Sequence, residues 1–405
     1  MQKWIDINQL RRGMYVCGIG ESWVSHPFWR SKLRLDSSED VKRFVDSGIK
    51  RIRIDTSKGV DVEKPAAPAP VAEKRIEPSA PAAPVATTME AELKQAARIC
   101  ATGREAVEAM FTDARMGRAL DVDGVGPLVE DISASVTRNP GALISLARIK
   151  TKDDYTYLHS VAVCALMVAL AKQMQLDERE TRKAALAGLL HDVGKAMMPL
   201  DILNKPGKLT DAEYDEMKRH PEAGHALLLD AEGADEIALD VCLHHHEKFD
   251  GSGYPHRLGG DALSPFARMG AICDVYDAVT SIRPYKNAWD PADAIRRMAE
   301  WHGHFDPLIF SAFVKSLGIY PIGSLVRLES GRLAVVIEQS RKSLVTPKVK
   351  VFFSTKAKCH LMPEVIDLSR PHCTEKIVGR ESAETWGLGN LDELWAGAVV
   401  VTEKR

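Results

Sequence analysis

A stretch rich in proline, alanine and valine, residues 61–87, divides the chain and constrains its fold more than any other feature. Nothing in this stretch can bury a core, so we interpret it as a semi-extended linker. A chain of 405 residues is long enough for two or three domains. The parts before and after the linker are therefore expected to fold around separate cores.

The composition is that of an ordinary globular protein. Apolar residues make up 45% and charged residues 27%, and a net charge of −2 provides no field of one sign that would recruit DNA or an anionic membrane. The first residues are too polar for a signal-peptide core, and the longest apolar run, residues 161–171, is too short to span a membrane. The 7 cysteines lack CxxC spacing, which indicates reduced thiols. We expect a cytoplasmic protein with no DNA partner and no membrane span.

Residues 1–60 mix strand and helix signals and predict a small α/β domain. Residues 13–19 and 50–55 are strand candidates, and a capped helix is expected to begin near Ser37. An aromatic loop, residues 23–29, either fills the small core or forms a sensory or partner surface. The sequence leaves both interpretations open.

Residues 88–138 return to helical periodicity and are predicted to form connecting helices. Leu93, Ala96, Ile99 and Cys100 lie on one broad apolar stripe. A helix with such a stripe either pairs with a second copy, giving a homodimer, or packs on the next domain. The pattern favours neither.

Residues 139–318 alternate helical segments with short polar turns, which predicts a compact all-α bundle. Beyond it the pattern changes, because residues 324–329, 332–339 and 348–353 are rich in strand-forming side chains. Residues 319–405 are therefore predicted to be a β-rich C-terminal region, although the last thirty residues offer no assignment. The predicted fold class is mainly α, with a small α/β domain before the bundle and a small β appendage after it.

Histidine and carboxylate recur within the bundle at the density of a metal site. His191-Asp192 is followed by Gly194 and Lys195, and residues 245–255 read His-His-Glu-Lys-Phe-Asp-Gly-Ser-Gly-Tyr-Pro. Imidazole and carboxylate without a nearby thiolate suit iron, manganese, nickel or zinc. Because the two oxygens of a carboxylate diverge, Asp192 can bridge two cations. Two cations about 3.5–4 Å apart can hold a shared hydroxide and clamp an in-line displacement.

These residues carry a family resemblance. His191-Asp192, Lys195 and residues 245–255, together with Asp274 and residues 283–286, look like the signatures of HD-GYP domains, a branch of the HD phosphohydrolase superfamily. The resemblance covers roughly residues 140–320 and implies hydrolysis of cyclic di-GMP in bacterial signalling. The N-terminal part resembles a small domain of unknown role that often precedes HD-GYP domains.

The resemblance implies two divalent metal ions, with iron or manganese favoured and nickel or zinc as alternatives. It assigns one metal to His159, His191, Asp192 and Asp274, and the second to Asp192, His220, His245 and His246. Some members of the family hold a third metal through a glutamate one helical turn before the first histidine. Here that position is Tyr155, a poor ligand at neutral pH, so we expect two metals and no third.

The same resemblance implies residues that bind the substrate. Lys195 is expected to present its charge to a nonbridging phosphate oxygen, and Arg283 and Lys286 match positions that contact the ligand's phosphates. Asp277 is expected to orient Lys286 or a water molecule. Tyr254 either lines the pocket, or its loop docks diguanylate cyclase domains, as proposed for relatives.

Two kinds of residue have competing interpretations. His159 and His220, taken alone, would be core or cap histidines, and only the surrounding constellation makes them ligands. Glu247 either accepts a hydrogen bond from a ligating imidazole or is solvated.

The expected reaction is attack of a metal-bridging hydroxide, positioned at Asp192, on phosphorus of cyclic di-GMP, which yields pGpG and, if the product is cut again, GMP. One alternative is a catalytically weak module that binds cyclic di-GMP and signals through the linker. Another is a different HD chemistry, such as nucleotide phosphohydrolysis or di-iron oxygenation. The Gly-Tyr-Pro loop and residues 283–286 speak against the last alternative.

Overall fold

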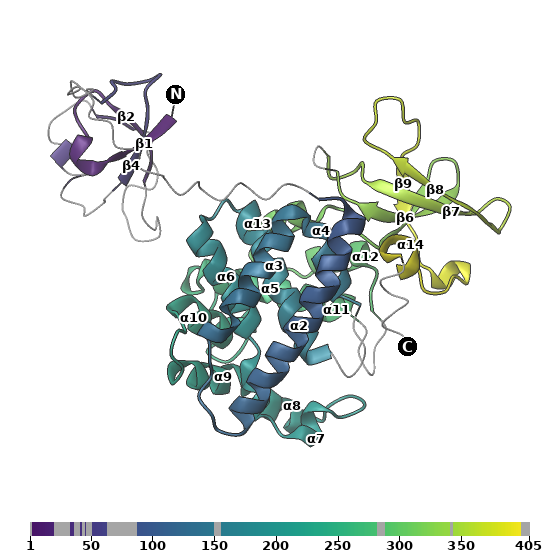
Figure 1. The fold of residues 1–405 in the computed structure, drawn as a ribbon, viewed down its shortest axis with the longest axis horizontal. Helices are drawn as coiled ribbons and strands as arrows, with labels where there is room; N and C mark the ends of the chain where they lie inside the picture. The colour runs from purple at the N-terminus through teal and green to yellow at the C-terminus, as the bar shows by residue number, and fades with distance from the viewer. Residues whose placement is uncertain are drawn as a thin grey trace, which may run out of the picture. The chain divides into compact units, whose positions relative to one another are not determined.

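The structure is a computed structural model of the 405-residue chain. It describes residues 2–19, 33–35, 41–42, 45, 51–62, 87–149, 155–281, 288–340 and 343–397. These residues belong to two compact units, Met1–Ala80 and Pro81–Arg405 (Figure 1). Each unit has a hydrophobic core of its own. The predicted linker lies almost wholly outside the described residues, and the finer domain boundaries stay predictions.

The N-terminal unit is built on a small antiparallel sheet with the strand order β1-β4-β2-β3. Its elements are β1 (Gln2–Asp6), the 3₁₀ helix η1 (Ile7–Gln9), β2 (Tyr15–Ile19), β3 (Leu33–Arg34) and β4 (Arg51–Asp55). Ile5, Val16, Ile52 and Ile54 point to one buried face, as the two-residue period of strands requires. Strands β2 and β4 confirm the two strand candidates. The aromatic loop lies outside the described residues, as does most of the helix expected after Ser37.

The second unit begins with the 27-residue helix α2 (Met89–Arg115), capped by Thr88, whose side chain accepts a hydrogen bond from the Ala91 N–H. Its predicted apolar stripe is buried, and the helix packs against α3 (Gly126–Arg138), α4 (Pro140–Ala147) and α5 (Tyr155–Gln173). The stripe therefore packs on the helical bundle, which is one of the two arrangements that the sequence left open.

The bundle continues with elements that follow in chain order. They are α6 (Glu178–Leu190), η4 (Val193–Met197), α7 (Leu200–Leu203), α8 (Asp211–Met217), α9 (His220–Leu229), α10 (Glu236–His244), η5 (Gly260–Ala262), α11 (Pro265–Thr280), α12 (Pro291–Ala299) and α13 (Pro307–Leu317). Local signals set several of these bounds. Thr210 and Glu213 form the predicted capping box at the start of α8, and Pro221 lies in the first turn of α9 as expected.

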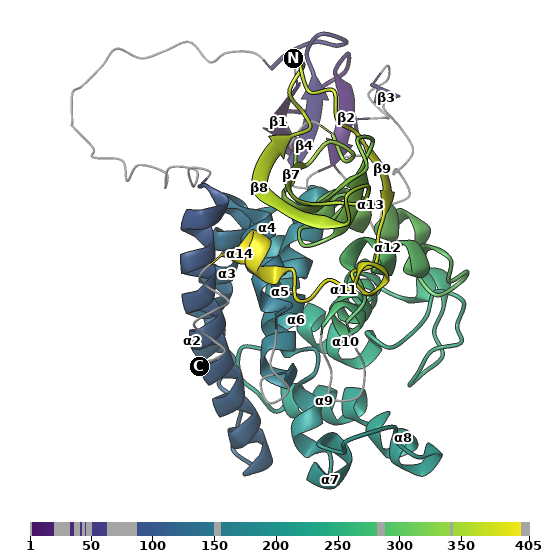
Figure 2. The same cartoon turned by 90° about the vertical axis from the view of Figure 1, so that its right-hand side faces the viewer.

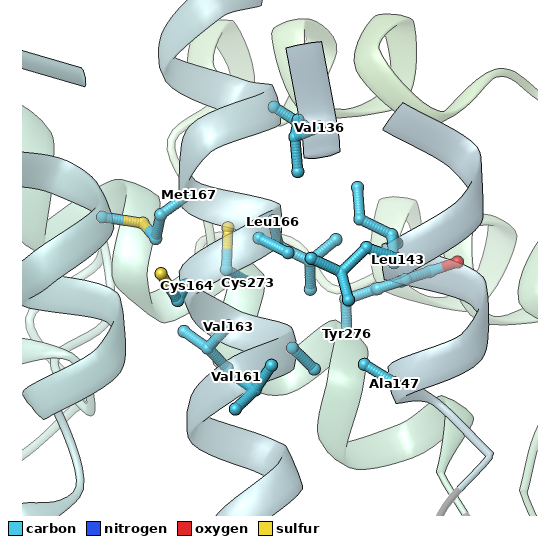
Figure 3. Packing of buried hydrophobic residues seen from close by; sticks show 14 of the residues in the cluster. Val136, Leu143, Ala147, Val161, Val163, Cys164, Leu166, Met167, Cys273 and Tyr276 are labelled. Carbon is cyan, nitrogen blue, oxygen red and sulfur yellow. The ribbon is translucent and has the colours of Figure 1, made fainter. Parts of the chain in front are cut away.

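Helix α5 runs through the centre of the bundle and packs against α2, α4, α6, α11 and α13. Figure 3 shows Val161, Val163 and Leu166 of this helix among buried side chains that include Leu143 of α4 and Tyr276 of α11. By length and composition the window Thr156–Gln173 would suffice to cross a membrane, yet 72% of it is buried inside the bundle. A helix that is apolar all round is what the core of a large bundle requires.

The C-terminal part is a five-stranded antiparallel sheet with the order β8-β7-β6-β5-β9, placed at the end of the bundle where α12 and α13 lie (Figure 2). Its strands are β5 (Leu325–Leu328), β6 (Arg332–Glu338), β7 (Lys348–Ser354), β8 (Cys359–Asp367) and β9 (Ile377–Arg380). The turn at Ser330-Gly331 joins β5 to β6 as predicted, with Gly331 at φ 83°. Buried residues of β5, β6 and β7 belong to the same hydrophobic core as the helices.

The fold class is confirmed, and several elements without a prediction lie at the end of the chain. Strands β8 and β9, the 3₁₀ helix η6 (Glu384–Trp386) and α14 (Asp392–Ala396) had no prediction. Most side chains of β8 are exposed on both faces, so the strand lacks the alternation that reveals a half-buried strand. Strand β9 has only 4 residues and pairs with β5, which is distant in the sequence.

Candidate metal centre

Five helices bring the seven predicted metal-binding residues together. His159 lies within α5, His191 caps the C-terminus of α6, and Asp192 follows it because the helix breaks into η4 at that point. His220 opens α9, His245 and His246 follow α10, and Asp274 lies within α11. All seven except His246 are buried, and the His246 side chain is 23% exposed.

The two carboxylate oxygens of Asp192 face different histidines. Asp192 Oδ2 lies 3.4 Å from His159 Nε2 and 3.4 Å from His191 Nε2. Asp192 Oδ1 lies 3.3 Å from His220 Nε2 and 3.7 Å from His245 Nε2. This is the arrangement that a carboxylate shared by two cations requires.

Asp274 stands beside the first pair of histidines. Its Oδ1 is 3.0 Å from His159 Nε2 and 4.0 Å from His191 Nε2, while its Oδ2 is 3.7 Å from His246 Nδ1. Two sets of candidate donor atoms result, each lying within 4.8 Å of one another: His159, His191 and Asp192, and Asp192, His220, His245 and His246. We call the first set, together with Asp274, the inner group, and the second set the outer group.

Hydrogen bonds on the far side of the rings define which nitrogen carries the proton. His191 Nδ1 lies 2.8 Å from the Gly188 carbonyl oxygen, His220 Nδ1 2.6 Å from that of Met217, and His245 Nδ1 3.0 Å from that of Cys242. A carbonyl oxygen only accepts, so each Nδ1–H donates and each Nε2 of the neutral ring presents a lone pair.

These lone pairs converge on one another and on a carboxylate. His159 Nε2 and His191 Nε2 are 3.3 Å apart, as are His220 Nε2 and His245 Nε2. Asp192 Oδ1 is buried and accepts no hydrogen bond from the residues that the structure describes. Buried acceptors that face one another without donors are unfavourable unless positive charge lies between them. The donor set therefore fits two divalent cations bridged by Asp192.

The protonation states agree with this fit. Burial raises the pKa of Asp192, but the charges of Lys195 and His191 and hydrogen bonds outweigh it and hold that pKa well below the usual range. Burial also lowers the pKa of His220 to about 4 and that of His246 well below its usual value. Ionised carboxylates and neutral imidazoles are the forms that bind metal.

His159 differs from the other histidines. Burial lowers its pKa, but hydrogen bonds to Asp192, Asp274 and Asp277 outweigh this and raise it to about 9. A proton on His159 Nε2 would lie between two carboxylates, where the structure favours positive charge.

Asp277 has a partner that the sequence analysis missed. Its Oδ2 lies 2.6 Å from His159 Nδ1, and its Oδ1 accepts a hydrogen bond of 3.3 Å from Ser281 Oγ. A carboxylate that holds the outer nitrogen of a ligating histidine fixes the ring and raises its basicity. Its spacing of one helical turn from Asp274 was the available signal. Lys286, the expected partner of Asp277, lies outside the described residues, as does Arg283.

The three histidines of the outer group line a cavity of about 1810 Å³, as does Asp274 of the inner group. Lys195 and Tyr254 also line this cavity, and Lys195 Nζ pairs with Asp192 Oδ2. Lys248 of the 245–255 motif also lines the cavity, and further cations come from segments that carry no motif: Arg115, Lys205, Lys208, Lys218 and Arg257. Among the described residues, Arg115, Lys208 and Lys248 have no carboxylate partner, so the cavity suits a ligand with several negative charges. Tyr155 begins α5, and its side chain lies outside the described part.

Comparisons with known proteins agree with this geometry. The family described as "HD domain" matches residues 134–309, and the "Domain of unknown function (DUF3391)" matches residues 2–125. The chain is 54% identical over 398 residues to the cyclic di-GMP phosphodiesterase PA4108 of Pseudomonas aeruginosa. The alignment covers 98% of this chain and 96% of that protein.

Two further relatives align over a smaller part of this chain or with a lower sequence identity. The chain is 42% identical over 181 residues to the cyclic di-GMP phosphodiesterase response regulator RpfG of Xanthomonas campestris, over 44% of this chain and 48% of that protein. The solved structure of Bd1817, an HDG"Y"P protein from Bdellovibrio bacteriovorus, aligns with a TM-score of 0.47 at 19% identity, over 78% of this chain and 99% of that chain.

Proposed function

Because the chain belongs to the HD-GYP family of cyclic di-GMP phosphodiesterases, we propose that it opens one phosphodiester of cyclic di-GMP and releases linear pGpG. The observation that carries this proposal is the convergence of two imidazole–carboxylate groups on opposite oxygens of Asp192. The outer group faces a basic cavity, which suits a cyclic dinucleotide with two phosphates.

His159, His191, Asp192 and Asp274 would hold one divalent cation, and Asp192, His220, His245 and His246 the other. Bound there, the cations would lower the pKa of a water molecule and offset the negative charge that develops on the phosphate. Iron or manganese is favoured for this donor set, with nickel and zinc as alternatives.

The chain's own groups prepare the reaction by holding donors in place. Backbone carbonyls fix the rings of His191, His220 and His245, and Asp277 fixes His159, so no reorientation is needed when substrate arrives. Lys195 stands at the cavity wall beside Asp192, where its ammonium can neutralise a nonbridging phosphate oxygen. Water adds to phosphorus, the bond to the ribose 3′-oxygen breaks, and that oxygen leaves with a proton. A second cut of pGpG would give GMP.

Product analysis on anaerobically purified protein tests the proposal. The protein is incubated with excess cyclic di-GMP and either manganese or ferrous iron, and the nucleotides are separated by chromatography. Appearance of pGpG that depends on the metal is the expected result. Binding of cyclic di-GMP without any product would instead identify a binding module, and turnover of other nucleotides alone would identify another HD chemistry.

A further inference from the structure

Glu247 is a buried acid that the proposed chemistry does not use. It directly follows His246, is only 2% exposed and lines the cavity. Its Oε1 accepts a hydrogen bond of 2.6 Å from the His256 N–H, while its Oε2 has no partner among the described residues. It therefore neither bonds to a metal-facing imidazole nor is solvated, the two roles considered from the sequence.

This hydrogen bond closes a loop onto the segment that carries His246. The Tyr254 N–H donates to the His246 carbonyl oxygen at 3.2 Å. A Cβ on Gly253 would stand 2.4 Å from Glu247 Cα and 2.6 Å from the His246 carbonyl oxygen, so only glycine permits this approach. Residues 253–256 thus lie directly on the backbone of residues 246–248.

The loop places an aromatic ring against His246. The ring centroids of Tyr254 and His246 are 4.8 Å apart with an interplanar angle of 25°. His191, His220 and His245 are each oriented by a backbone carbonyl, whereas His246 makes no hydrogen bond through its ring to any described residue. Its contacts are the stack on Tyr254, an edge contact with the His220 ring, a tilted contact with the His245 ring, and Asp274 at 3.7 Å. The Tyr254 ring thus takes the place of the missing carbonyl.

We propose that Glu247 is a positioning residue for His246. By accepting the His256 N–H, Glu247 closes the loop that carries Tyr254, and the Tyr254 ring holds the His246 imidazole toward the outer group. This inference rests on the proposed metal centre, because His246 is assigned to it. The role needs one acceptor oxygen and not a negative charge, so glutamine should replace glutamate.

The experiment compares Glu247→Gln and Glu247→Ala in the full chain, with Glu236→Ala as control, since Glu236 is exposed and opens α10, the helix that ends shortly before Glu247. Amide hydrogen exchange at His256, manganese affinity of the purified protein, and kcat and KM for cyclic di-GMP are measured. For Glu247→Ala we expect faster exchange at His256 and an affinity for the second manganese ion lower by about 10-fold or more. Glu247→Gln should rescue both quantities, and the control should match the unaltered protein.

Equal damage in Glu247→Gln and Glu247→Ala would overturn the proposal, because the charge would then matter. Unchanged exchange and metal affinity in Glu247→Ala would overturn it as well. If Glu247→Ala does not fold, Tyr254→Leu removes the aromatic ring and leaves the Glu247 acceptor in place. This variant should bind the second manganese ion with lower affinity, while amide exchange at His256 stays slow. If these effects appear but the unaltered protein forms no pGpG, the positioning role stands and the proposed function fails.

Discussion

The inner and outer groups share Asp192 but differ in how one histidine of the outer group is held. In the inner group, His159 and His191 are wholly buried and each is fixed by a strong acceptor, the Asp277 carboxylate and the Gly188 carbonyl. In the outer group, His246 is partly exposed on the cavity wall and relies on the stack with Tyr254. The comparison teaches that the other histidines of both groups are preorganised by hydrogen bonds, while His246 lacks one and keeps a face open to the cavity.

The largest effect is expected where the two groups meet. Asp192→Ala removes the carboxylate that the two groups share, so both metals should be lost and activity should fall on the order of a thousand-fold. Metal content by elemental analysis and pGpG formation measure the change, with circular dichroism as the check on folding. A folded, metal-free variant with full activity would reject the mechanism.

A smaller effect is expected when only the inner group is disturbed. Asp277→Ala removes the acceptor for His159 Nδ1, so metal affinity or activity should fall by about 10- to 100-fold. Ser281→Ala is the matched control, because Ser281 Oγ donates to the other oxygen of the same carboxylate. Equal losses in the two variants would show that the carboxylate does not act through His159.

Lys195 belongs to neither group, so its substitution should affect catalysis without affecting metal binding. Lys195→Ala is expected to keep both metals and to lower kcat/KM for cyclic di-GMP by about 10-fold or more, because a cation facing the phosphate is lost. Metal content is measured beside the kinetics. Loss of metal in this variant would place Lys195 among the groups that shape the centre.

The smallest effect is expected in the pH dependence of stability of the metal-free protein. His159 of the inner group and His220 of the outer group should contribute slopes of opposite sign. The pKa of His159 is raised from 6.5 to about 9, so its contribution is complete below pH 6.5 and is lost as the pH rises through 9. The pKa of His220 is lowered from 6.5 to about 4, so stability is complete above pH 6.5 and declines as the pH falls toward 4.

Thermal melting in the presence of a chelator, from about pH 4 to about pH 9, tests both slopes. His159→Gln should flatten the alkaline slope alone, and His220→Gln the acidic slope alone. A common slope in both variants would mean that other groups dominate the titration.

Much of the helical framework could be predicted because its signals are local. Thr210 and Glu213 mark the start of α8, Pro221 marks the first turn of α9, and Gly194 lies where α6 gives way to a 3₁₀ turn. The end of the chain could not be predicted because its strands lack such local signals. Strand β9 exists through its pairing with β5, and β8 shows both faces to solvent, so neither leaves a periodic pattern.

The sequence by itself determined which side chains are available: the His-Asp pair, the paired histidines before a glycine loop, and the caps that begin several of the helices. Only the tertiary structure decided which oxygen of Asp192 faces which histidine. It also brought Asp277 to His159, which lies 118 residues away, and gathered cations from separate segments around one cavity. Spacing along the chain defines directions within one helix, whereas contacts between helices depend on how their apolar faces pack.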